Sequence, residues 1–193
     1  MRISFGQFQR QTFIEEIKNY KKYLMSEPLK KFRDDMINEI DENWKKFEAE
    51  NKGMDFYEFE AEADEVRFQN SMKSLMCYRL YSSLYQNIFS IWELQVQDSY
   101  TPVKLDYNDK ITEFKTVVNV LKHGSGRSYD YLKRIDSKYL QEPKEFPYLL
   151  PNVHSGRTLN LEFKDLPEFC DTLIKAWEDI DREKRAEELE PNA

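Results

Sequence analysis

The chain has 193 residues, of which 40% are hydrophobic and 15% aromatic, with only 5 glycines and 7 prolines. This composition supplies enough apolar surface for a folded core, which excludes a disordered chain, and the scarcity of turn residues argues against an all-β protein. The net charge of −7 disfavours non-specific binding to nucleic acid or to anionic membranes, so any nucleic-acid role must depend on a local basic patch.

The N-terminal residues and the cysteines predict a cytoplasmic protein. The first residues lack the apolar region of a secretory signal, and no stretch approaches the roughly 20 apolar residues of a membrane span. Cys77 and Cys170 occur in helical patterns without a CxxC pair, which predicts buried, reduced thiols rather than a disulfide or a zinc site. We therefore expect no membrane contact, no metal and no cofactor.

The first half of the chain is charged and has helical periodicity. Apolar spacing predicts one helix over residues 8–25 and a second from about Pro28 to Glu50. Asp55 and Glu58 form a capping box that begins a third, strongly acidic segment ending at Glu65. Such a run of carboxylates is typical of a solvated helix face, and the alternative is a docking face for a basic partner.

Residues 68–97 predict the most apolar helix, which we expect at the centre of the fold. One i, i+4 row along it is apolar and consists of Met72, Met76, Leu80, Leu84, Ile88 and Trp92. A neighbouring polar row contains Arg79, Ser83 and Asn87. This row faces either a buried site or the solvated edge of the core, and Arg79 needs an acceptor in either case.

The second half predicts shorter elements. A compact helix over residues 109–122 ends at Gly124, and a helical turn follows Ser128. Residues 141–157 indicate a surface loop, and the alternating residues 158–163 predict one short strand or hairpin. Asp165 and Glu168 form a capping box for the last helix, and the charged tail 182–193 should fray.

These elements together predict an all-α, antiparallel helical bundle with one short β-strand or hairpin near its C-terminal end. We expect a single domain over residues 1–193. Within it, residues 1–66 are charged helices that can form an appended arm, residues 67–181 form the core bundle, and residues 182–193 form the frayed tail.

The compact helix carries the most informative polar pattern. Four polar side chains with spacings of four, three and four residues share one stripe of that helix, and they are Thr112, Thr116, Asn119 and His123. Lys115 and Lys122 border the stripe. Arg127 follows His123 across a Gly-Ser-Gly turn, where backbone amides can approach a ligand closely.

The stretch between Lys115 and Lys138 contains six basic and two acidic residues, with three tyrosines interleaved. This composition suits contact with phosphates and stacking on bases. In a phosphate-handling site, His123 would act as general acid or base, while Arg127 or Lys122 would neutralise developing charge. The alternative is a helix C-terminus at which the histidine and lysine only satisfy carbonyls and the helix dipole.

His154, the second of two histidines, precedes Arg157 in a similar Gly-containing turn. Both His-then-Arg turns could converge on one anion, and the favoured alternative is a coincidence between two loop-like segments. Two histidines without a matching set of acidic or cysteine ligands do not predict a metal site.

Two segments of the chain resemble HEPN-like helical proteins of bacteria, many of which belong to toxin–antitoxin and anti-phage defence systems. The segments are Arg79-Leu-Tyr-Ser-Ser-Leu-Tyr-Gln-Asn-Ile-Phe and Asn119-Val-Leu-Lys-His-Gly-Ser-Gly-Arg-Ser. The resemblance covers roughly residues 68–132. It implies a helical bundle that forms a homodimer, with the motif helices meeting at the dimer cleft.

Active members of that family are metal-independent endoribonucleases whose motif is an arginine, often followed by a polar residue, and then a histidine. By resemblance, His123 matches the histidine and Asn119 the polar residue. Thr116, Val117 and Val118 occupy the positions where the arginine belongs, so Arg127 or Arg79 would have to replace it in space.

Two hypotheses follow from the resemblance. The first is a HEPN-like module of a defence or toxin–antitoxin system that binds RNA, a nucleotide or a cognate protein without catalysis. The alternative is an endoribonuclease with a composite site of His123 and Arg127, near Asn119. In both cases the expected anion-binding residues are Lys115, Lys122, Arg79, His154 and Arg157.

Overall fold

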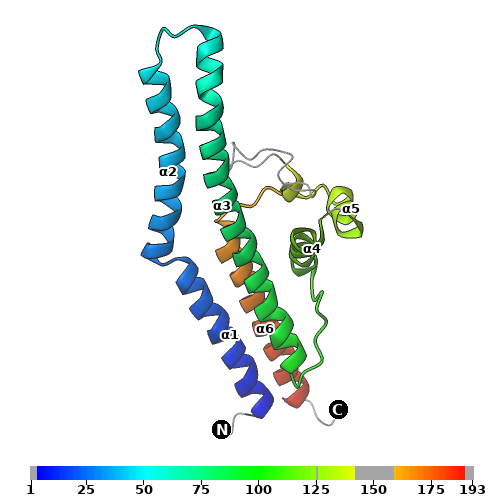
Figure 1. Cartoon of the computed structure of the whole chain (residues 1–193). Helices are drawn as coiled ribbons and strands as arrows, with labels where there is room; N and C mark the ends of the chain where they lie inside the picture. The colour runs from blue at the N-terminus through cyan, green and yellow to red at the C-terminus, as the bar shows by residue number, and fades with distance from the viewer. Residues whose placement is uncertain (1–3, 125, 142–158, 190–193) are drawn as a thin grey trace.

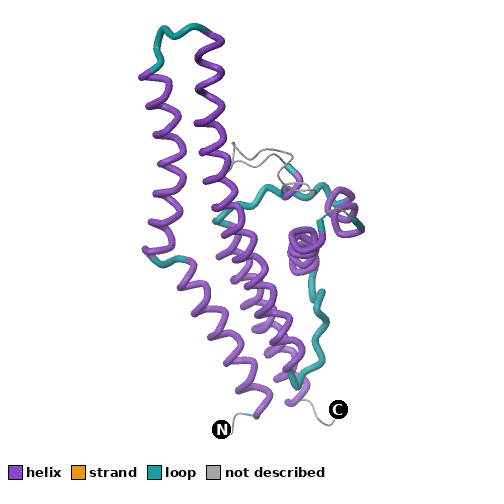
Figure 2. Tube along the Cα trace, in the orientation of Figure 1, coloured by secondary structure: helices purple, strands orange, loops and turns teal. Residues whose placement is uncertain are grey.

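The computed structural model describes residues 4–124, 126–141 and 159–189. Within these ranges the chain forms α-helices and one short 3-10 helix and has no strand, as Figure 2 shows. The elements are α1 (Phe5–Leu24), α2 (Glu27–Glu50), α3 (Phe56–Asp98), α4 (Asp109–His123), α5 (Arg127–Arg134), η1 (Lys138–Leu140) and α6 (Asp165–Leu189). The predicted all-α class is therefore confirmed.

Local sequence signals explain where the first three helices begin. Ser4 accepts a hydrogen bond from the Gln7 amide at the start of α1, and α2 carries a proline in its first turn. Asp55 caps α3 by accepting from the Tyr57 amide. No break follows Glu65, so the predicted acidic segment and the predicted central helix are one continuous helix of 43 residues.

Because α3 is about 65 Å long at the usual helical rise, it contributes to two different regions (Figure 1). Its N-terminal half pairs with α2 in a two-helix projection, and we call residues 27–76 the arm. Its C-terminal half packs with α1, α4 and α6 in what we call the body. The predicted domain division at residue 66 stays a prediction.

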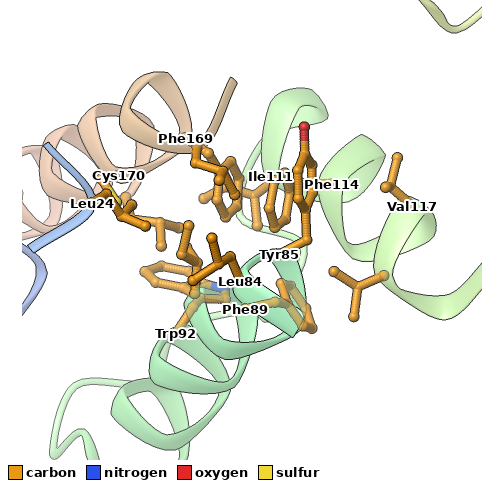
Figure 3. Close-up of a cluster of buried hydrophobic side chains, with 14 of the residues drawn as sticks. Leu24, Leu84, Tyr85, Phe89, Trp92, Ile111, Phe114, Val117, Phe169 and Cys170 are labelled. Carbon is orange, nitrogen blue, oxygen red and sulfur yellow. The ribbon is translucent and has the colours of Figure 1, made fainter. Parts of the chain in front are cut away.

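The body contains a large cluster of buried hydrophobic side chains (Figure 3). Trp92 and Trp177 are fully buried and lie 5.3 Å apart between ring centroids. Phe114 of α4 stacks on Tyr85 of α3 and on Phe169 of α6. These contacts join helices that are distant in the sequence, and they hold α4 against the centre of the molecule.

The predicted apolar row of α3 is buried only in its C-terminal part. Leu84, Ile88 and Trp92 are buried, whereas Met72 and Met76 are exposed. Each i, i+4 step turns by about 40° more than a full turn, so five steps rotate the row by roughly 200° around a straight helix. The row therefore leaves the core as α3 enters the arm, and its two methionines face solvent.

The predicted short strand is wrong within residues 159–163, the described part of its range. All five residues are buried, and they run between the body helices without a pairing strand. The Leu159 amide donates to the Tyr78 hydroxyl and the Asn160 amide to the Tyr139 carbonyl. The Asn160 side chain donates to the Lys138 carbonyl and to the Glu162 carboxylate. The buried polar residues of the alternating pattern are therefore satisfied within the protein, so alternation does not indicate a solvent-facing strand here.

No helix among the described residues is both long enough and apolar enough to cross a membrane. Cys77 and Cys170 are both buried and reduced, as predicted. Most of the predicted surface loop, residues 142–157, lies outside the described residues.

Candidate anion-binding surface on α4 and α5

Helix α4 is held at both ends and along its apolar face, which positions its polar stripe. Asn108 accepts a hydrogen bond from the Ile111 amide at the start of the helix. At the other end, the Gly124 amide donates to the Val120 carbonyl at 2.7 Å, and Gly124 has a positive φ of 73°. The predicted glycine C-cap is confirmed, and glycine suits this conformation because it has no Cβ.

The N-terminal half of the polar stripe has no free hydroxyls. Thr112 donates to the Asn108 carbonyl and Thr116 donates to the Thr112 carbonyl, each four residues back. Thr116 is also buried. Asn119 is half-buried and His123 is exposed, so the part of the stripe that can meet a ligand is its C-terminal end.

Arg127 is the first residue of α5 and lies across the glycine turn from His123. Its side chain is exposed, and Gly126 at the N-cap position provides no side-chain cap for α5. In the part of the chain that the structure describes, no hydrogen bond or ion pair joins Asn119, His123 and Arg127. The fold places these residues around one turn, but it does not assemble them into a hydrogen-bonded catalytic group.

The charge of this region contrasts with that of the whole chain. Residues 109–141 contain seven basic and four acidic residues. Lys138 pairs with Asp165 at 2.6 Å, and Lys122 lies 4.0 Å from Glu93. The remaining cations of α4 and α5 have no ion pair among the described residues, and they are Lys110, Lys115, Arg127, Lys133 and Arg134. They are therefore available to an external anion. We call the surface formed by Lys115, Asn119, Lys122, His123 and Arg127, with the exposed cations of α5, the α4–α5 surface.

The three interleaved tyrosines do not contribute equally. Tyr129 and Tyr131 are half-buried, and the Arg134 guanidinium lies 5.3 Å from the centre of the Tyr131 ring. Tyr139 is buried beside Tyr85, and this burial raises the pKa of its hydroxyl. Tyr139 therefore belongs to the core and cannot stack on a base, which corrects that part of the prediction.

Arg79 is exposed on α3, and no hydrogen bond or ion pair among the described residues joins it to α4 or α5, so its predicted role in the site stays a prediction. Tyr85, which stacks on Phe114 of α4, lies six residues further along the same helix. At about 100° per residue, the two side chains point roughly 120° apart. His154 and Arg157 lie outside the described residues, so their predicted convergence with His123 stays a prediction.

A polar pocket that the sequence did not predict lies between α4, η1 and α6. Its volume is about 470 Å³, and Glu113, Lys138, Tyr139 and Asp165 are among its lining residues. The buried Asp165 carboxylate accepts from Lys138 and from the Tyr85 hydroxyl, while Glu113 accepts from Ser137. Burial raises the pKa of Tyr85, so its hydroxyl stays protonated and keeps donating.

These bonds indicate a structural role for the pocket residues. Each polar group in its buried part already has a partner within the chain, and together they fasten η1 and the start of α6 to α3 and α4. The sequence did not indicate this arrangement. The capping-box pattern predicted that the Asp165 carboxylate caps α6, whereas in the structure it accepts hydrogen bonds from Lys138 and Tyr85.

The described residues contain no cluster of His, Cys, Asp and Glu side chains that could hold a metal ion. No known protein family, no characterised protein and no solved structure matches the chain.

Proposed function

We propose that this protein is a cytoplasmic, HEPN-like helical module of a bacterial defence or toxin–antitoxin system, and that it binds RNA through the α4–α5 surface. The observation that supports this proposal is the set of exposed or half-buried cations on α4 and α5 that have no ion pair among the described residues. They occur in an acidic protein, where solvation alone gives no reason to concentrate them on one side of the fold.

The chemistry of single-stranded RNA fits this surface. Phosphates would lie against Arg127, Lys133 and Arg134, and the release of counterions from RNA would drive much of the binding. Tyr131 is partly exposed beside Arg134, so a base can stack there on a π face and a planar guanidinium. A homodimer and a cognate protein partner, both implied by the resemblance, stay predictions.

The second candidate function is a metal-independent endoribonuclease. The observation that favours it is that His123 and Arg127 are both exposed at the two ends of one short turn. In such a reaction His123 would accept the proton of a ribose 2′-hydroxyl while the 2′-oxygen attacks the adjacent phosphorus. The P–O5′ bond would break, the leaving 5′-oxygen would take a proton from water, and Arg127 would neutralise the phosphate charge. We rank binding above cleavage because the upstream arginine of the motif is missing.

Fluorescence anisotropy of a labelled single-stranded RNA, measured over a series of salt concentrations, tests the proposal. We expect the double substitution Arg127→Ala and Lys133→Ala to weaken binding and to reduce the slope of log K against log salt by about 1.4 for two lost phosphate contacts. The matched control is Lys45→Ala with Lys52→Ala, which removes the same charge from the arm. Equal weakening by both pairs, or no binding by the wild type, would contradict the proposal.

A cleavage assay in EDTA separates the two candidates. If the protein only binds RNA, the RNA stays intact at high protein concentration. His123→Ala then changes the affinity for RNA, and no cleavage products appear with either protein. RNA products that form in EDTA and disappear in His123→Ala would establish the endoribonuclease instead.

A further inference from the structure

The exposed face of α3 in the arm carries a short apolar stripe. Phe68, Met72 and Met76 are 60%, 45% and 59% exposed, and they follow one another at intervals of four residues. Single exposed apolar side chains are common and need no explanation. Three successive ones on one helix face keep a continuous apolar surface in water, which indicates that another surface covers them.

Charged residues flank this stripe symmetrically about Met72. Phe68 and Met76 each lie four residues from Met72, and Glu65 and Arg79 each lie seven residues from it. Seven residues are close to two full helical turns, so Glu65, Met72 and Arg79 share one face. Glu65 and Arg79 are both exposed. Along this face the order is acid, three apolar residues and base. When a second copy of the helix runs in the opposite direction, each acid therefore lies opposite a base and the apolar residues lie opposite one another.

We propose that the arm of a second copy of this chain covers the stripe, with the two α3 helices antiparallel and a two-fold axis passing at Met72. In this arrangement Met72 meets the partner's Met72, Phe68 meets the partner's Met76, and Glu65 meets the partner's Arg79. Each contact occurs twice, as a two-fold interface requires.

The ends of the stripe support this choice of occupant. Arg79 has no ion pair or hydrogen bond among the described residues, and Glu65 accepts only from Gln69 within its own helix. A parallel pairing would bring each glutamate against the other copy's glutamate, whereas the antiparallel pairing joins opposite charges at both ends. The charge pattern therefore selects one orientation.

The surroundings of the stripe leave room for a second helix. Ala61 and Ser83 lie eleven residues on either side of Met72, and both are small and exposed. They would face each other across the interface and allow the backbones to approach. In Figure 1 the upper part of α3 has α2 on one side and no other helix beside it.

The expected dimer is reversible. Residues 27–76 carry 14 acidic and 8 basic residues, so two arms repel each other at long range. A contact between two single helices also falls near the low end of stable interfaces, which bury about 1,200 Å² or more. We therefore expect a monomer–dimer equilibrium that depends on protein concentration and is visible in the micromolar range.

Sedimentation velocity of the full chain without RNA tests the inference through charge reversal. Glu65→Arg and Arg79→Glu should each weaken the dimer by roughly tenfold, because each change places like charges at both ends of the interface. The double variant restores opposite charges and should return the dissociation constant to about the wild-type value. Asp35→Arg, on the exposed side of α2, is the matched control and should have little effect.

Met72→Cys provides a geometric test, since only a residue on the two-fold axis meets its own copy. Mild oxidation should link two copies of this variant through one disulfide, while Met76→Cys should link much more slowly. All of the substituted side chains are exposed, so we expect each variant to fold, and circular dichroism checks this.

A wild type that stays monomeric at high micromolar concentration overturns the inference. A dimer that survives both single charge reversals, or one that the double variant fails to restore, overturns it as well. A dimer that is lost instead on substitution of His123 or Arg127 would place the interface at the α4–α5 surface, as the resemblance implies, and not on the arm. Because RNA is absent, none of these outcomes depends on the proposed RNA binding.

Discussion

The arm and the body use the same long helix in opposite ways. In the body, α3 is enclosed by helices that contact it through large buried aromatic side chains, of which Trp92 and Tyr85 are examples. In the arm, α3 has one helical neighbour, and the best-buried apolar contacts are few, with Ile40, Phe47 and Ala63 among them. One continuous helix can therefore pass from a densely packed core into a thin, charged projection.

This difference indicates which region provides the folding stability and which region can contact another molecule. Folding free energy comes mainly from apolar burial, so the body should determine the global stability of the chain. The arm buries less and carries most of the net negative charge, and its exposed stripe is free for contact with another surface. Substitutions in the body should therefore lower global stability strongly, whereas substitutions in the arm should have smaller effects confined to the arm.

The largest effect is expected from Trp92→Ala in the body. The indole is fully buried, contacts Trp177, and donates to the Leu105 carbonyl at 2.9 Å. Removal of a buried aromatic side chain costs about 3–5 kcal/mol through lost burial and a residual cavity. Urea denaturation should show this loss as a lower midpoint of the global unfolding transition. Leu94→Ala on the exposed side of the same helix is the control, and an equal loss there would contradict the core assignment.

A slightly smaller effect is expected where α1 meets α6. Arg10 is 3% exposed and donates to Asp181 at 2.8 Å and to Thr101 at 3.1 Å. Asp181→Ala leaves this guanidinium buried without its carboxylate, which should cost about 3 kcal/mol.

Asp179→Ala provides the comparison on the same helix. Asp179 pairs with Arg182, whose side chain is 77% exposed, and such surface pairs contribute less than about 1 kcal/mol. Thermal denaturation of the two variants should therefore give clearly different midpoints. Similar midpoints would show that Arg10 finds another partner or water.

In the arm, Phe47→Ala should have a smaller and more local effect. Phe47 is buried between Trp44 and Phe59, and its loss should open α2 and the N-terminal half of α3 before the body unfolds. We expect faster amide hydrogen exchange in the arm and a loss of global stability smaller than the about 3–5 kcal/mol typical of a buried aromatic side chain. Phe56→Ala is the control, since that ring is 67% exposed. Uniformly faster exchange in the body would mean that arm and body unfold as one unit.

The smallest effect concerns the thiol of Cys170. Burial raises its pKa to about 12, so almost no thiolate exists at neutral pH, and the thiol is also shielded from reagents. Iodoacetamide should modify it slowly in the native protein and quickly in guanidinium chloride. Fast modification of the native protein would show that α6 opens readily, and it would weaken the distinction between a densely packed body and a sparsely packed arm.

The residues that bind RNA in our proposal were predictable in type but not in arrangement. Helical spacing alone placed Asn119 and His123 on one stripe, and Gly124 indicated where that stripe ends. Whether Arg79 joins them could not be predicted, because its direction depends on which side of α3 packs against α4. Tyr139 likewise has the composition of a stacking residue, yet the contact between η1 and α3 buries it.

The all-helical class, most helix boundaries and the buried cysteines follow from the sequence by itself, because capping residues and apolar periodicity act over a few neighbouring positions. Only the tertiary structure decided that Met72 and Met76 face solvent and that residues 159–163 run buried between helices without forming a strand. The reason is physical. Periodicity shows which residues share a face, but burial of that face depends on where distant helices end, and α3 continues well beyond the helices that surround its C-terminal half.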